Sequence, residues 1–210
     1  MRNPDLQSLA RSFADSITGL LNATITDGLR LSPVVAGGRK ELVFLGFKLT
    51  KDNLVAKEAF PLNSFSRQSL FMSVYFRLEL DPEGRYLTVG SSSFGVYESA
   101  DVRSGSGALF RYEYERNKAD GYPEAHLHAR CDWELGGVPA RSTHLPLGDR
   151  RYRPCLEDVV QYLIVEGACS PRNEQWRATL DVTRNEFHER QFRAAIRRSP
   201  DLARAALAEL

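Results

Sequence analysis

Three segments of this 210-residue chain alternate apolar and polar residues, and this alternation limits the fold more than any other feature. The segments are Leu70–Leu80, Ala108–Arg116 and Ala125–Glu134. Because residues i and i+2 of a strand point to the same side of a sheet, each segment would have one apolar and one polar face. The pattern therefore predicts strands of an antiparallel sheet that is packed on one side.

The second and third of these segments are joined by a loop rich in turn-forming residues. Asn117–Glu124 contains Asp120-Gly121 and Pro123, so we expect Ala108–Arg116 and Ala125–Glu134 to pair as an antiparallel hairpin. We expect a loop over Ser32–Lys40 and a turn over Asp81–Gly84. The other expected strands are Glu41–Leu49, a weak one within Asn53–Leu62, a return strand formed by Arg85–Val89 and Phe94–Glu98 with an interruption at Gly90–Ser93, and Ser142–Leu147.

Helices are predicted at both ends of the chain. Asn3 and Pro4 are typical of a helix start, and apolar residues recur at helical spacing to about Asn22. Pro154, Pro171 and Pro200 mark the starts of three further helical segments. The order of helix, strands and helices predicts an α+β protein whose helices pack on one face or end of an antiparallel sheet. Residues 1–168 would form the sheet domain, and residues 169–210 a helical extension or a part of the same domain.

Composition excludes several classes of function. The net charge is +1, so binding of a polyanion would need a local basic patch. Cys131, Cys155 and Cys169 form no CxxC pair, which argues against a zinc ribbon or a redox motif. No apolar run approaches the ~20 residues of a membrane span, and the N-terminus resembles no signal peptide. We expect a cytoplasmic protein without a membrane partner.

Three of the four histidines lie within one 19-residue stretch, from His126 through His128 to His144. In the predicted hairpin, His126 and His128 would lie beside Glu113 on the polar face. A neighbouring carboxylate fixes the tautomer of an imidazole and raises its pKa. His126 and His128 could then act as acid and base in phosphodiester cleavage, with Glu113 and His144 as further members of the site.

The same residues are compatible with two other interpretations. A solvated sheet face with paired charges would have no chemistry, and the protein would then be a non-catalytic interaction module. Alternatively, the protein could be a metal-dependent hydrolase in which His126, His128 and His144 are three nitrogen ligands of a metal ion, with Glu113 or Glu115 as a fourth ligand or a base. We prefer the interpretation with His126 and His128 as acid and base, in which the site needs neither a metal nor another cofactor.

A basic and aromatic run precedes the second helical segment. Arg151, Tyr152 and Arg153 could contact a phosphate backbone and stack on a base, and Arg130 could steady the same phosphate from the hairpin. A solvated loop that leads into the helix at Pro154 would have the same composition. These four residues are the candidate substrate-binding residues.

Two segments resemble known bacterial sequences. Phe110–Glu115 (FRYEYE) and Ala125–Arg130 (AHLHAR) resemble the Tyr-rich strand and short histidine motif of TumE-like toxins, and His144–Ile164 resembles uncharacterised actinobacterial proteins. The first resemblance implies a toxin–antitoxin or phage-defence setting and RNase activity at His126 and His128. We therefore expect a bacterial protein that acts on RNA, with an antitoxin, another protein or a second copy as further partners.

Overall fold

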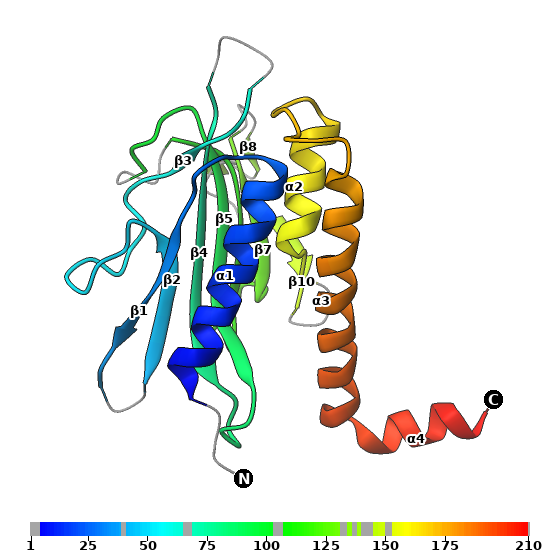
Figure 1. The fold of residues 1–210 in the computed structure, drawn as a ribbon. Helices are drawn as coiled ribbons and strands as arrows, with labels where there is room; N and C mark the ends of the chain where they lie inside the picture. The colour runs from blue at the N-terminus through cyan, green and yellow to red at the C-terminus, as the bar shows by residue number, and fades with distance from the viewer. Residues whose placement is uncertain are drawn as a thin grey trace.

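The computed structural model describes residues 5–38, 41–64, 69–102, 107–130, 134–135, 138–139, 145–149 and 153–209. Its centre is an antiparallel eight-stranded sheet in the order β1-β2-β4-β5-β6-β7-β10, with β3 paired to β4 (Figure 1). The strands are β1 (Leu31–Ala36), β2 (Leu42–Phe47), β3 (Phe60–Pro61), β4 (Phe71–Leu80), β5 (Leu87–Tyr97), β6 (Ala108–Glu115), β7 (Ala125–Ala129) and β10 (Leu145–Gly148). A separate pair joins β8 (Glu134–Leu135) to β9 (Val138–Pro139). The predicted α+β class is confirmed.

The helices α1 (Leu6–Thr24), α2 (Leu156–Val165) and α3 (Trp176–Arg198) lie on one side of the sheet (Figure 1). Phe13 of α1 packs edge-to-face on Phe76 of β4, with ring centroids 5.0 Å apart. Tyr162 of α2 makes the same kind of contact with Phe110 of β6 at 5.6 Å. The main core therefore lies between this face of the sheet and the helices, and we call this face the helix-covered face.

The N-terminal helix begins later than predicted. Its N-cap is Asp5, whose carboxylate accepts hydrogen bonds from the backbone N–H groups of Gln7 and Ser8, both at 3.2 Å. The prediction of Asn3 as the cap is therefore wrong, and Asn3 itself lies outside the described residues. A carboxylate at this position also complements the positive end of the helix dipole.

The predicted loop at Ser32–Lys40 is wrong over its first half, where the structure has the edge strand β1. Pro33 lies opposite Leu45 of β2, and β1 has no neighbour on its other side in the described sheet. A proline has no N–H group to donate to a neighbouring strand, which a central strand would require. An edge strand has a neighbour on one side alone and therefore tolerates proline. The apolar residues Val34 and Val35 follow it in the same strand.

The predicted interruption at Gly90–Ser93 is also wrong, since β5 is continuous. Its register with β4 shifts at this point: Ser91 lies opposite Arg77, but Val89 lies opposite Leu78. Gly90 is thus the additional residue of a β-bulge, a common position for glycine in a strand. A Cβ atom at Gly90 would lie 3.1 Å from Nε of Arg77, so the bulge closely approaches that side chain.

The predicted hairpin is confirmed as the antiparallel pair β6 and β7. Its register places Glu113 opposite His126 and Arg111 opposite His128. The expected strand over Ser142–Leu147 is present as β10 from Leu145 onward, where it pairs with β7, and its first three residues lie outside the described residues. The turn before β5 is also as predicted, with Gly84 N–H donating to the carbonyl of Asp81 at 2.8 Å.

The C-terminal helices differ in how much of them is buried. Cys169, Trp176 and Leu180 belong to the main core, so the first half of α3 packs with the sheet domain. The second half of α3 has exposed apolar residues such as Phe192, and α4 (Pro200–Ala208) has no buried residue and points away from the body (Figure 1). Among the described residues, no helix has both the length and the hydropathy that crossing a membrane requires.

Candidate functional site

The strand alternation of the hairpin separates its side chains between two faces of the sheet. Phe110 and Tyr114 are four residues apart in β6 and therefore point to the same side of the sheet. Because Phe110 contacts Tyr162 of α2, Tyr114 is buried on the helix-covered face. Glu113 and the directly opposed His126 therefore lie on the other face, which we call the Glu113 face. Tyr97 also lies on this face and forms a second small apolar cluster there with Ala59 and Val102.

Two imidazoles converge on one carboxylate oxygen of this face. Oε2 of Glu113 lies 3.3 Å from Nε2 of His126 and 3.1 Å from Nε2 of His128. The two rings are 5.1 Å apart at their centroids and nearly perpendicular, at 77°. His126 is only 1% exposed, whereas the side chain of Glu113 is 30% exposed, so solvent reaches the cluster through the carboxylate.

The other carboxylate oxygen of Glu113 is bound by an arginine. Nε of Arg111 lies 2.6 Å from Oε1. Burial raises the pKa of Glu113, but the hydrogen bond with His128 and the charge of Arg111 outweigh this effect and hold the pKa at about 2. Glu113 is therefore a carboxylate at neutral pH, with Oε2 directed at the imidazoles.

Tyr97 supports Arg111 from the neighbouring strand. Burial raises the pKa of Tyr97, whereas the charge of Arg111 and a hydrogen bond with it act in the opposite direction. The Tyr97 ring fills the space above Gly95, because a Cβ atom at Gly95 would lie 2.6 Å from the phenol oxygen. A chain of contacts thus runs from Gly95 through Tyr97 and Arg111 to Glu113.

The hydrogen bond of His126 to the backbone determines which ring nitrogen is protonated. Nδ1 lies 3.1 Å from the carbonyl oxygen of Pro123, and because a carbonyl can only accept, Nδ1 must carry the hydrogen. In the neutral ring, the lone pair of Nε2 is then directed toward Oε2 of Glu113. A backbone carbonyl bound to the distal nitrogen is a common feature of metal-ligating histidines.

The cluster has the donor atoms of a metal centre. Within the described part of the chain, one ligand atom each from Glu113, His126 and His128 can be chosen so that all three lie within 4.8 Å of one another. Two imidazoles and a carboxylate form a donor set that suits divalent transition metals and leaves coordination positions open. Of the residues expected in the metal alternative, the structure brings together His126, His128 and Glu113, while His144 lies outside the described residues.

Of the remaining predicted site residues, the two that the structure describes, Arg130 and Arg153, are not part of this cluster. Arg130 follows β7 and forms an ion pair with Glu98 at 2.7 Å, with both side chains about half exposed. Arg153 contacts Tyr114 and Phe187, so it lies on the helix-covered face and not beside Glu113. His144, Arg151 and Tyr152 lie outside the described residues.

Arg111 and Tyr97 are the residues for which the sequence analysis assigned no role in the site. Arg111 was detectable, since the predicted hairpin already placed it on the polar face two residues before Glu113. Tyr97 was not detectable, because its position depends on the register of β5 beyond the bulge at Gly90.

Comparisons with known protein families, with curated proteins and with solved structures find no significant match.

Proposed function

We propose that Glu113, His126 and His128 bind a divalent transition-metal ion and that this centre hydrolyses phosphodiester bonds. The observation that carries the proposal is the convergence of both Nε2 atoms on Oε2 of Glu113, at 3.3 and 3.1 Å. An ion bound by these donors would activate water and polarise a phosphoryl oxygen. Arg111 would hold Glu113 by its other oxygen and leave Oε2 available as a ligand.

A role as metal ligands suits the two histidines better than a role as a pair of acid and base. An acid or base must reach the proton that it transfers. Nδ1 of His126 is bound to the carbonyl of Pro123, its Nε2 faces Glu113, and the residue is almost fully buried. Nε2 of His128 faces the same oxygen. These orientations favour coordination of an ion over contact with a substrate.

RNA is the substrate class that we propose. Two observations support it. The strands that form the cluster contain the segments Phe110–Glu115 and Ala125–Arg130, which resemble TumE-like toxins, a group thought to act on RNA. In addition, Arg111 balances the charge of Glu113 at 2.6 Å, so a divalent ion bound at the cluster would leave the site with a net positive charge for an anionic substrate.

Metal titration of the full chain tests the first half of the proposal. After treatment with a chelator, the wild type should bind Zn²⁺ by calorimetry and Co²⁺ with visible absorption bands. The substitution Glu113→Gln should weaken Zn²⁺ binding by about 100-fold or more, the upper end of the loss seen for residues that only support a ligand. Glu115→Gln is the matched control, because Glu115 carries the same charge on the same strand and interacts with Lys118 at 3.6 Å.

Cleavage of a labelled single-stranded RNA tests the second half. The metal-loaded wild type and Glu115→Gln should cleave it, and Glu113→Gln should not. Equal Zn²⁺ affinity of Glu113→Gln and Glu115→Gln would contradict the metal centre. Loss of metal binding in Glu113→Gln without any RNA cleavage by the loaded wild type would retain the metal centre and reject RNA as the substrate.

A further inference from the structure

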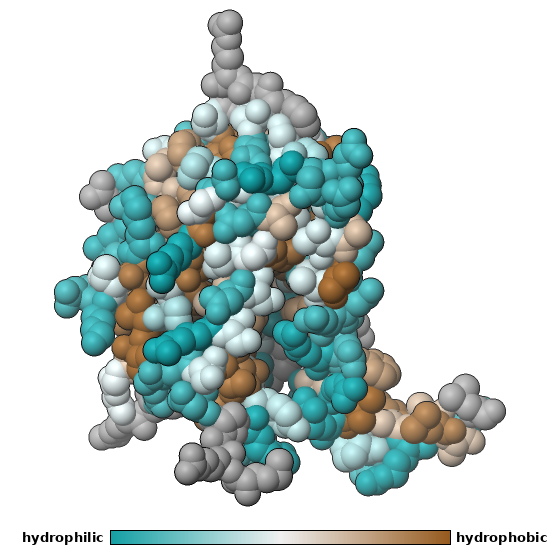
Figure 2. Space-filling model, in the orientation of Figure 1, coloured by the Kyte–Doolittle hydropathy of each residue, from teal (hydrophilic) through white to brown (hydrophobic). Residues whose placement is uncertain are grey.

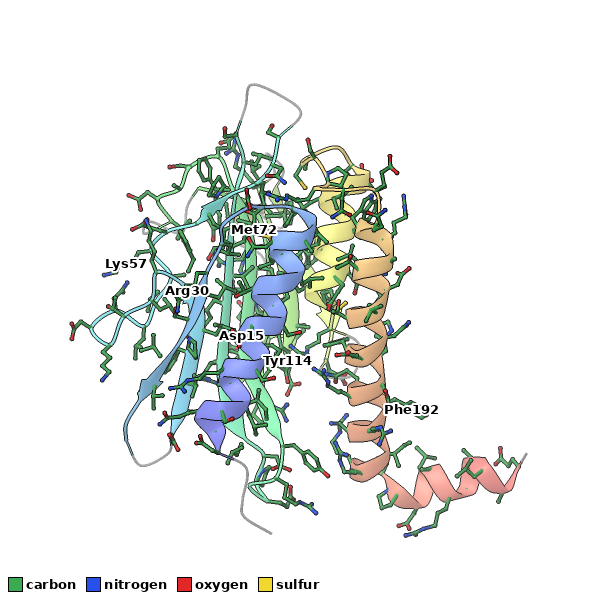
Figure 3. All side chains as sticks on the ribbon, viewed as in Figure 1. Asp15, Arg30, Lys57, Met72, Tyr114 and Phe192 are labelled. Carbon is green, nitrogen blue, oxygen red and sulfur yellow. The ribbon has the colours of Figure 1, made fainter. Side chains whose placement is uncertain are left out.

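A second cationic site lies on the helix-covered face, on the opposite side of the sheet from Glu113. Cζ of Arg153 lies 4.5 Å from the ring centroid of Tyr114 on β6 and 5.4 Å from that of Phe187 on α3. Nη1 of Arg153 donates to the hydroxyl of Ser92 on β5 at 3.4 Å. Figure 3 shows Tyr114 on the side of the sheet that faces α3. Arg153 therefore lies between the sheet and the middle of α3.

Arg184, one turn of α3 before Phe187, is an arginine whose charge and N–H donors have partners within the protein. Its guanidinium donates to carboxylate oxygens of Asp158 at 3.0 Å and Asp181 at 2.9 Å. It also donates to the side-chain oxygen of Gln161 at 2.6 Å and to the backbone carbonyl of Glu157 at 3.3 Å. The Arg184 side chain is only 16% exposed, and its charge is balanced by neighbouring acids.

The charge of Arg153 is not balanced by acids in this way. Across the described residues, its polar contact is the neutral hydroxyl of Ser92, and no carboxylate lies within ion-pair distance of it. A guanidinium has five N–H donors, and a desolvated charge without a counter-ion is unfavourable. Contacts with the faces of Tyr114 and Phe187 offset a part of this cost but supply no acceptor for the remaining donors.

A second positive charge, that of Arg116, acts on Arg153. Burial, together with a smaller contribution from the charge of Arg116, lowers the pKa of Arg153 to about 10. Arg153 therefore stays protonated at neutral pH. Arg116 itself follows β6, and its Nε donates to the carbonyl of Val89 at 3.4 Å. Arg116 comes two residues after Tyr114, which lies opposite Ser92, and its backbone N–H donates to the carbonyl of Gly90 at 2.9 Å. By strand alternation it therefore continues the row of β6 side chains on the helix-covered face, at the end where Ser92 lies.

The second half of α3 is placed over the sheet by two stacking contacts. Phe187 contacts Arg153, and three turns later Arg197 lies over the ring of Tyr86 at 4.6 Å. In the space-filling view, a hollow separates this part of α3 from the rest of the body (Figure 2). Arg153 is half-buried, so its charge is partly desolvated but not sealed from solvent.

We propose that Arg153 and Arg116, with the hydroxyl of Ser92, bind a phosphate group, as inorganic phosphate or as the end of a phosphate monoester. Two guanidinium charges match a phosphate dianion, and a tetrahedral anion can accept from both arginines and the hydroxyl at once. A carboxylate would have only one charge and two oxygens for these donors. The site is independent of the metal centre proposed above.

Melting temperatures and calorimetry in buffer without phosphate test this proposal. Inorganic phosphate at constant ionic strength should give a saturable rise in the melting temperature of the wild type. Arg153→Met should weaken phosphate binding at least about tenfold, and Arg153→Lys should weaken it less, since lysine keeps the charge but loses the planar fork. Without phosphate, Arg153→Met should melt at or above the wild-type temperature, because a desolvated charge is removed.

Arg184→Met is the matched control, and it should lower the melting temperature while the rise on addition of phosphate persists. Methyl phosphate distinguishes the two sources of the group: binding like that of inorganic phosphate indicates a monoester ligand, and no binding indicates free phosphate. Equal rises with phosphate in wild type and Arg153→Met, or equal rises with sulfate and phosphate in both proteins, would overturn the proposal. Arg153 would then be a structural residue. The same conclusion would follow if Arg153→Met had a melting temperature as low as that of Arg184→Met and phosphate did not raise the melting temperature of the wild type.

Discussion

The two faces of the central sheet differ in what their side chains contribute. On the helix-covered face, residues such as Val74, Phe76 and Leu163 are almost fully buried in one continuous core. On the Glu113 face, charged and polar groups are held against one another at hydrogen-bond distance. The strand β6 serves both faces, with Tyr114 directed to the helices and Glu113 to the other side. Burial of apolar area therefore stabilises the fold from one side, which leaves the other side available for ligand binding.

The largest effect expected from a test of this difference comes from the core. Leu163 of α2 is fully buried, so Leu163→Ala should lower the free energy of unfolding by about 2–5 kcal/mol, measured by urea denaturation. Leu207→Ala on α4 is the control, because Leu207 is 71% exposed and should change stability by no more than about 0.5 kcal/mol. Similar values for the two variants would show that the helix-covered face does not dominate stability.

An intermediate effect is expected where packing supports the Glu113 face. In Gly95→Ala, the new Cβ atom would lie 2.6–2.8 Å from the end of the Tyr97 ring, which is too buried to move freely. We expect a loss of about 1–3 kcal/mol of stability from overpacking and a fall in Zn²⁺ affinity smaller than that of Glu113→Gln. Gly37→Ala is the control, since no atom lies within 4 Å of its added Cβ. Unchanged Zn²⁺ affinity would show that Tyr97 and Arg111 do not position Glu113.

The smallest effect is expected at the edge of the helix-covered face. Asp5→Ala removes the cap of α1 and should cost about 1 kcal/mol, measured by urea denaturation without a change in Zn²⁺ affinity. Asp15→Ala, in the exposed middle of the same helix, should be neutral or slightly stabilising because alanine favours helix. A loss of metal affinity in Asp5→Ala would mean that the two faces are coupled.

The sequence predicted those parts of the molecule that depend on local chemistry. The turn residues between Asn117 and Glu124, together with the polarity alternation, were sufficient to predict the hairpin that brings Glu113 beside His126. The order of elements was likewise sufficient to predict the fold class. What failed depends on neighbours in space: Pro33 is acceptable in a strand only because that strand is at an edge, and Ser91–Ser93 are in a strand because two partners flank them.

The details of the site were less accessible from the sequence. Alternation alone placed Glu113, His126 and His128 on one face, but it could not show that both imidazoles would face the same oxygen atom. The hydrogen bond from His126 to the carbonyl of Pro123 depends on how the loop folds back, and it changes the proposed role of His126 from a base to a ligand. Arg153 was predicted near the histidines, yet its contacts lie with Tyr114 and Phe187 across the sheet.

The bulge at Gly90 has a consequence for how this chain can change in evolution. Before the bulge, the odd-numbered residue Val89 packs with the core. After the bulge, the even-numbered residue Phe94 does so, because the extra residue shifts the alternation by one position. Deletion of this one glycine would exchange inside and outside for one half of the strand. We would therefore expect relatives of this chain to keep the length of β5 unchanged even where its side chains have diverged.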